Sequence, residues 1–167
     1  MAENFDNNVY CEFPEAVAKA GKDILLCLFT SDGTKLLAIA GQQSLTINRS
    51  ADTVETTSKD TKGGWKSQMA GMKEWSIDSD GAYVMCAESH KELQKYFESG
   101  DLMCIKIVDI KESKPLFGGL AVLTEYTLEA PYDDAMTYSC SIAGNGALVD
   151  LTSLSEEDKK KVTAMPA

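Results

Sequence analysis

The chain has 167 residues, a length typical of one domain, and its hydrophobic (44%) and charged (25%) fractions exclude disorder as the overall state. Asp and Glu total 26 against 16 Lys and Arg, which gives a net charge of -10, and Arg49 is the only arginine. A protein that binds nucleic acid on its surface needs Lys and Arg to neutralise phosphates and Arg to read bases. The charge balance therefore argues against a nucleic-acid-binding function.

The sequence predicts neither a membrane span nor a signal peptide. No stretch approaches the roughly 20 apolar residues of a spanning helix, and residues 1–10 lack a basic region followed by an apolar one. Five scattered cysteines form no CxxC pair or Cys/His cluster, so we expect no disulfide framework, zinc site or cofactor. Free thiols fit a reducing cytoplasm. The cysteines are Cys11, Cys27, Cys86, Cys104 and Cys140.

Alternation of apolar and polar residues dominates the chain and predicts antiparallel strands. In chain order these lie at 24–29 and 36–40 around a turn, at 45–54, from Trp75 onward, at 102–110, and at 120–128 and 136–142 around a second turn. From Leu120, we expect the even positions to be apolar, with polar residues between them. The pattern predicts a mainly β protein, an antiparallel β-sandwich or barrel of about seven or eight strands.

One segment, residues 89–98, has a helical pattern instead. Ser89 and Glu92 are spaced as a capping box, Leu93 and Tyr96 belong to an apolar stripe, and Gly100 follows the last turn. We expect a single α-helix on the flank of the strands.

A long loop is expected at residues 59–73, which have three glycines, no periodicity and a lone Trp65. Loops of this length are usually functional or disordered. We divide the chain into an N-terminal arm (1–20), a β domain (21–150) and a charged C-terminal extension (151–167).

Charge is unevenly distributed along the chain. The long loop is basic, whereas residues 1–18 hold four acids without a cation and residues 115–150 hold five. Chance clustering is one explanation. The other is self-complementarity, in which a basic arm on one copy docks on an acidic face of the next and propagates into rings or tubes.

Catalytic candidates are few. Cys86 and His90 lie four residues apart and would need to touch to act as a nucleophile and its base. We expect instead a buried cysteine and a solvent-facing histidine. Asp78 and Asp80 are expected in a turn, and no phosphate-binding, dinucleotide-binding or GxSxG motif is present. The sequence therefore indicates that the protein is not an enzyme.

An ordered set of segments resembles the major tail proteins of long-tailed (siphovirus) phages of Gram-positive bacteria. The segments are residues 63–65 (GGW), 69–72 (MAGM), 74–83 (EWSIDSDGAY), 118–123 (GGLAVL), 129–134 (EAPYDD) and 141–148 (SIAGNGAL). The resemblance covers roughly residues 20–150.

The resemblance implies a β-sandwich tail-tube subunit, related in fold to the type VI secretion tube protein. Such subunits form rings of six that stack head to tail into a tube, the conduit for DNA delivery into the host. It also implies a place in the virion tail, assembly in the host cytoplasm, and tape measure, tail terminator and distal tail proteins as partners. DNA would pass without being bound, because an acidic wall repels phosphates.

Two groups of residues are predicted to serve assembly. In the family a long loop reaches the adjacent ring, and its members here would be Lys59, Lys62, Gly63, Gly64, Trp65, Lys66, Met69, Gly71, Met72 and Lys73. The polar face of the 120–142 hairpin would line the lumen, through Glu125, Thr127, Glu129, Thr137, Ser139 and Ser141. The alternative lining is the strand region near Thr46, Asn48 and Glu55.

Three other functions stay open at this stage. A type VI-like secreted tube protein would share the fold. A free-standing β-sandwich binding module would need an aromatic platform or convergent loops, and no aromatic row is evident on the polar faces. A cysteine hydrolase would rest on Cys86 and His90 alone.

Overall fold

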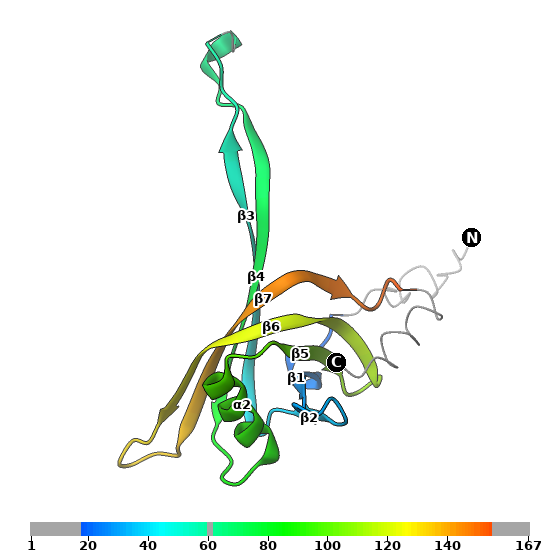
Figure 1. Ribbon diagram of the computed structural model, residues 1–167, viewed down its shortest axis with the longest axis vertical. Coiled ribbons are helices and arrows are strands. Elements are labelled where there is room, and N and C mark those ends of the chain that lie inside the picture. Colours follow the sequence, from blue (N-terminus) through cyan, green and yellow to red (C-terminus); the bar gives the residue numbers. More distant parts are fainter. Residues whose placement is uncertain (1–17, 60–61, 155–167) are drawn as a thin grey trace, which may run out of the picture.

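The computed structural model describes residues 18–59 and 62–154. Seven strands and one α-helix make up most of this part of the chain (Figure 1). In chain order the elements are η1 (Gly21–Asp23), β1 (Ile24–Phe29), β2 (Leu36–Ala38), β3 (Gln42–Glu55), η2 (Lys62–Gly64), β4 (Gln68–Ala82), α2 (Glu88–Ser99), β5 (Met103–Asp109), β6 (Lys114–Glu129) and β7 (Thr137–Asp150).

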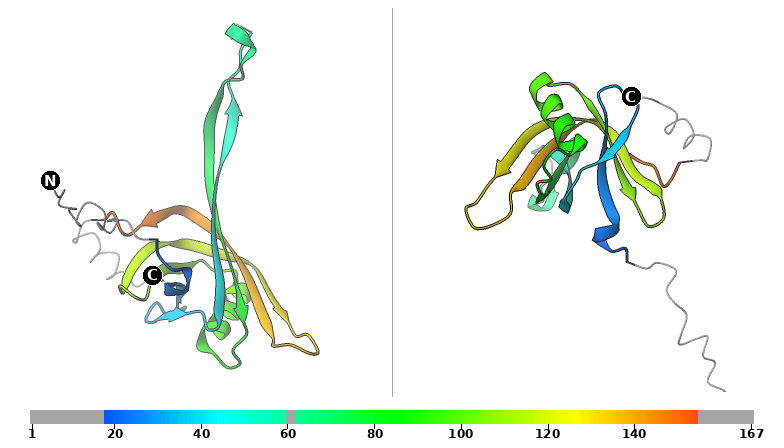
Figure 2. Two further views of the ribbon diagram at one scale, coloured as in Figure 1. Left: turned by 180° about the vertical axis from the view of Figure 1, so that it is seen from behind. Right: turned by 90° about the horizontal axis from the view of Figure 1, so that it is seen from below.

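All seven strands belong to one antiparallel sheet in the order β2-β1-β5-β6-β7-β4-β3. The predicted mainly β fold, the number of strands and the single helix at about residues 89–98 are confirmed. The sheet is not closed into a barrel, because its edge strands β2 and β3 do not pair with each other. It curves strongly instead, and α2 lies on one side of the curve (Figure 2).

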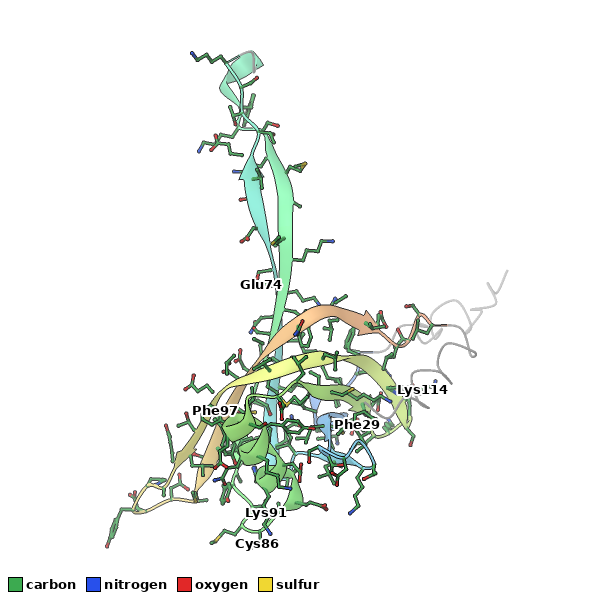
Figure 3. The ribbon with its side chains drawn as sticks, viewed as in Figure 1. Phe29, Glu74, Cys86, Lys91, Phe97 and Lys114 are labelled. Carbon is green, nitrogen blue, oxygen red and sulfur yellow. The ribbon has the colours of Figure 1, made fainter. Side chains whose placement is uncertain are left out.

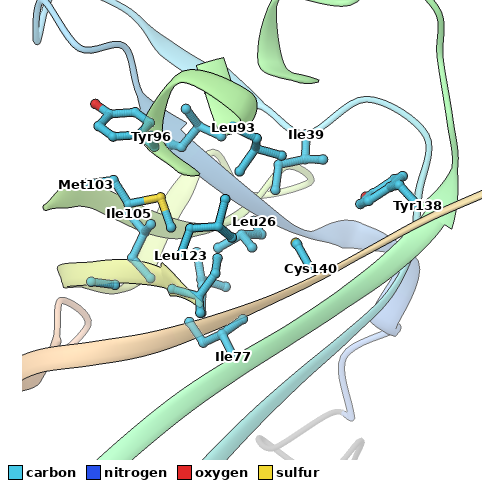
Figure 4. Close-up of a cluster of buried hydrophobic side chains, with 14 of the residues drawn as sticks. Leu26, Ile39, Ile77, Leu93, Tyr96, Met103, Ile105, Leu123, Tyr138 and Cys140 are labelled. Carbon is cyan, nitrogen blue, oxygen red and sulfur yellow. The ribbon is translucent and has the colours of Figure 1, made fainter. Parts of the chain in front are cut away.

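The hydrophobic core lies between the curved sheet and α2 (Figure 4). Leu93 and Tyr96 of α2 are buried there, and the Tyr96 hydroxyl donates a hydrogen bond to the Phe29 carbonyl (2.9 Å). This bond satisfies the one polar atom that the tyrosine carries into the core. The sheet contributes apolar side chains from six strands or their flanks, including Leu26, Ile39, Ile77, Met103, Ile105, Leu123, Tyr138 and Cys140.

The predicted capping box is wrong. Ala87 is the N-cap of α2 and makes no side-chain cap bond. The Ser89 hydroxyl accepts the Ala40 N–H (3.1 Å), and the Glu92 carboxylate accepts the Ser31 N–H (3.2 Å) and pairs with Lys95 (2.5 Å). Both side chains therefore fasten the helix to the β1–β3 segment rather than to its own first turn.

A bulge in β6 reverses which residues face the core. Leu123 pairs with Ile142, but Glu125 pairs with Ser141, so Thr124 is the extra residue. Just before the bulge the odd positions Ala121 and Leu123 are buried. Leu120 is 45% exposed, which contradicts the expectation that the even positions form the apolar face. After the bulge Tyr126 turns inward and the two glutamates turn outward, as predicted, but Leu128 is 43% exposed, which contradicts the alternation at that position.

Candidate assembly surfaces

β3 and β4 extend beyond the rest of the sheet as a long two-stranded arm (Figure 1). β4 pairs with β7 only from Ser76 onward, whereas its pairing with β3 continues out to Gln68 opposite Glu55. The predicted loop at 59–73 is therefore too long, because residues 68–73 are strand. These residues have no alternation of apolar and polar side chains, so the sequence does not predict a strand there. Their strand conformation comes from backbone pairing with β3.

The arm exposes almost every residue of the predicted inter-ring loop. Trp65 is 81% exposed and Met72 is 84% exposed. Large apolar side chains this exposed are not buried against the described part of the chain, and they lie on the arm together with lysines. Gly71 is half-buried, and Lys62 lies in η2 with its side chain outside the described residues. The exposed members are Lys59, Gly63, Gly64, Trp65, Lys66, Met69, Met72 and Lys73.

The six predicted lumen residues share one face of the β6–β7 hairpin. The register places them directly opposite one another as Glu125 with Ser141, Thr127 with Ser139, and Glu129 with Thr137. Their neighbours in sequence, Tyr138, Cys140 and Ile142, are buried on the opposite face. The Thr127 hydroxyl donates a hydrogen bond to the Glu125 carboxylate (3.2 Å).

The same polar face continues across β4 and β3. Asp78 accepts hydrogen bonds from the Ser141 hydroxyl (2.7 Å) and the Asn48 amide (2.8 Å). Thr46 pairs with Asp78, so this part of the alternative lining belongs to the same surface as the hairpin. Glu55, by contrast, lies far out on the arm, opposite Gln68.

This surface, which we call the acidic face, is defined by carboxylates and hydroxyls from β3, β4, β6 and β7. Asp78 and Asp80 lie within β4 and not in the expected turn, as the Trp75–Ile77–Ser79 alternation of buried residues could have indicated. Arg49 and Lys73 belong to the other face, because Arg49 pairs with Trp75. The carboxylates of the acidic face are Glu74, Asp78, Asp80, Glu125 and Glu129, with Glu74 at the base of the arm (Figure 3).

Cys86 and His90 do not form a catalytic pair. His90 is 3% exposed, and its Nε2–H donates to the Ala40 carbonyl (3.0 Å), so Nδ1 accepts the Tyr126 hydroxyl (3.0 Å). Both ring nitrogens are occupied, and burial lowers the pKa of the imidazole. Cys86 is exposed. The expected buried cysteine and solvent-facing histidine are thus reversed, because α2 packs its first turn beneath the β2–β3 connection.

No group of three or more His, Cys, Asp or Glu side chains within residues 18–59 and 62–154 is arranged to hold a metal ion. No helix in this part of the chain is long and apolar enough to cross a membrane.

Comparison with known proteins gives the family. The chain matches the model of a family described as phage tail tube protein over residues 18–150. A protein from the tail of an empty gene transfer agent particle, refined with C6 symmetry, is 25% identical with a TM-score of 0.71, over 80% of this chain and 98% of that one. The SPP1 tail tube protein shares the fold at 15% identity, with a TM-score of 0.64 over 87% of this chain and 86% of that one.

A subunit of the anti-feeding prophage baseplate also shares the fold, at 8% identity with a TM-score of 0.57 over 83% of this chain and 99% of that one. No curated protein sequence matches the chain. Because the family model matches most of its length, the chain belongs to the phage tail tube protein family.

Proposed function

We propose that six copies of this chain form a ring and that the rings stack into a tail tube that conducts DNA into a host cell. The observation that carries this proposal is the family match over residues 18–150, together with the likeness to a tail protein of a C6-symmetric particle. The role is structural and not enzymatic, which the occupied imidazole of His90 supports.

Two strand edges support ring closure. β3 is an edge strand of 14 residues that pairs with β4 alone. β6 pairs with β5 only as far as Ala121, so its stretch from Val122 to Glu129 has β7 as its single strand partner. Unpaired edges are templates for another chain. Pairing of β3 in one subunit with this part of β6 in the next would join the acidic faces into one continuous surface.

The acidic face is the proposed lining of the lumen. In a ring of six, each carboxylate of the face recurs six times, so the wall repels the phosphates of a passing duplex and DNA slides without being retained. The hydrogen bonds from Ser141 and Asn48 hold the Asp78 carboxylate in place on this face. Both linings predicted from the sequence contribute to this wall, apart from Glu55.

The arm is the proposed contact between rings. Its exposed Trp65, Met69 and Met72 would be buried against the adjacent ring, and its lysines would meet an acidic surface there.

The division of the chain into three parts also stays a proposal. A tube domain at 21–150 would be flanked by the N-terminal arm at 1–20 and the C-terminal extension at 151–167, which lie largely outside the described residues.

The wider setting follows from the resemblance in sequence. We place the protein in the tail of a siphovirus with a Gram-positive host, assembled in the host cytoplasm. The tape measure protein would fill the tube during assembly, and tail terminator and distal tail proteins would contact its two ends.

Assembly of the purified full-length protein tests the function. A tube protein gives hexameric rings or filaments by negative-stain microscopy and masses in multiples of six by mass photometry. A free-standing module stays at the 18.1 kDa of one chain. A protein that is still monomeric at millimolar concentration, with and without crowding agents, would refute the proposed tube.

A further inference from the structure

A groove lined by residues of β3, β4 and β7 lies at the base of the arm. Figure 1 shows that the arm and the C-terminal part of β7 diverge there. The groove encloses about 690 Å³ and forms where β7 separates from β4 beyond Ala143. Trp75 forms its floor, held by a hydrogen bond from its indole N–H to the Gly146 carbonyl (2.8 Å). This hydrogen bond ties the Trp75 indole of β4 to the backbone of β7.

The groove is cationic with an apolar floor. Arg49 and Lys73 line it, and neither makes an ion pair with any described residue. The Arg49 guanidinium stacks on the Phe117 ring, 4.9 Å from its centroid, which fixes the charge in position. Among the described residues that line the groove, Glu74 is the one acid, and its carboxylate accepts a hydrogen bond from the Ser50 hydroxyl (2.8 Å). The lining thus carries two positive charges, of which stacking holds Arg49, and one negative charge around the Trp75 indole, in a protein of net charge -10.

The β6–β7 turn, residues 130–136, has the complementary chemistry at the other end of the molecule. Tyr132 is fully exposed, and Asp133 and Asp134 beside it make no ion pair within the described residues. The turn is anchored where the Met136 carbonyl accepts the Tyr83 N–H (2.8 Å), and Pro131 restricts its backbone. It projects away from the direction in which the arm points (Figure 1).

We propose that the β6–β7 turn of one subunit seats in the arm-base groove of a subunit in the adjacent ring. Tyr132 would pack toward the Trp75 floor, and Asp133 and Asp134 would pair with Lys73 and Arg49. Because the groove lies on the side of β7 from which the arm projects and the turn lies at the far end, a shift along the long axis brings the two together. This inference rests on the proposed stacking and names the surfaces that stack.

Reciprocal charge reversal in the full-length protein tests the pairing. Lys73→Glu alone, and Asp133→Lys alone, should each raise the concentration needed for half-assembly roughly five- to tenfold, since like charges then face each other across the contact. The two changes together should restore assembly to within about twofold of the parent protein. Lys73 is preferred to Arg49 because replacing Arg49 would also remove its stacking on Phe117.

Matched controls separate the contact from general charge effects. Lys91→Glu on α2 and Asp101→Lys after it change the same charges at exposed positions outside both surfaces, and should leave assembly unchanged. Single reversals that assemble normally, or that weaken assembly without rescue by the double variant, would overturn the pairing. Either result leaves the tube function standing, whereas a parent protein that forms no rings removes it.

A proximity test keeps the proposal falsifiable if charge variants aggregate. Tyr132→Cys combined with Ala147→Cys, in a Cys86→Ser background, should give disulfide-linked ladders when assembled tubes are oxidised, because Ala147 lines the groove. Each single cysteine variant should give none. Ladders that are absent from well-formed oxidised tubes of the double variant would place the turn elsewhere.

Discussion

Substitution of Gly144 by alanine should destabilise the folded subunit through Trp75. A Cβ added at Gly144 would overlap the Cε2, Cδ2 and Nε1 atoms of the Trp75 indole. The ring cannot move without losing the hydrogen bond from its N–H to the Gly146 carbonyl (2.8 Å), and Trp75 is only 7% exposed. The glycine is required by close packing and not by a left-handed backbone.

The expected cost combines two effects. Forcing an extra methyl group into a packed core costs about 1–3 kcal/mol, and loss of the indole hydrogen bond adds about 1 kcal/mol. For a domain of this size, about 2–4 kcal/mol lowers Tm by roughly 5–15 °C. Gly119→Ala serves as a comparison of intermediate severity. A Cβ there would lie 3.1 Å from Trp75 Cζ2, so the indole ring needs to shift only slightly.

Thermal unfolding, measured at protein concentrations low enough to keep the subunit monomeric, checks the size and the order of the effects. Gly144→Ala should be the most destabilised variant and Gly119→Ala intermediate. Gly21→Ala should match the parent, because nothing lies within 4 Å of a Cβ there. In a Trp75→Phe background the cost of Gly144→Ala should shrink. Equal Tm values for the Gly144 and Gly21 variants would refute the packing argument.

Three further outcomes are expected. Glu125→Lys with Glu129→Lys should permit tail assembly but slow genome release, most strongly at low salt where screening is weak; normal release at low salt would place this face outside the tube. Trp65→Ala should leave the Tm of the monomer unchanged, because the side chain is 81% exposed. It should nevertheless weaken assembly measured by mass photometry. Unaltered assembly would show that the arm tip does not take part in the contact between rings. Burial holds the pKa of His90 below its ordinary 6.5, so the unfolded chain binds the proton first. The free energy of unfolding should therefore fall as pH drops from about 7 through the pKa of the unfolded histidine toward that of the folded one. In thermal melts between pH 7 and 5, His90→Gln should lose less stability than the parent protein. An identical pH profile in the two proteins would contradict the role of His90 in this loss.

Local pattern was enough to predict the strands, the helix and the polar face. The alternation in residues 136–142 separates Ser139 and Ser141 from the buried Cys140 and Ile142 because successive side chains of a strand point to opposite faces. The apolar stripe of α2 likewise predicted the buried Leu93 and Tyr96. The polar residues of the β6–β7 hairpin were predicted as one group for the same reason, and the register places them on one face.

The arm and the buried histidine depended on contacts between distant segments. Residues 68–73 have no alternation, and their strand conformation comes from pairing with β3. Ser89 and Glu92 have the spacing of a capping box, yet Ala40 and Ser31 offer them backbone N–H groups that only the folded chain brings near. His90 is buried by the same packing of α2 against the β2–β3 connection.

Tertiary structure also decided how the polar residues combine. The bulge at Thr124 lets Leu123 and Tyr126 both face the core, and a period of two cannot place such an extra residue. The order β6-β7-β4-β3 joins hairpin residues to Asp78 and Thr46, which are far away in the sequence, in a single acidic face. The residue pattern is enough to assign the polar side chains of a strand to one face, because successive side chains point to opposite faces. Which strands lie side by side is set by long-range pairing, and so only the fold determined the acidic face and the groove at the base of the arm.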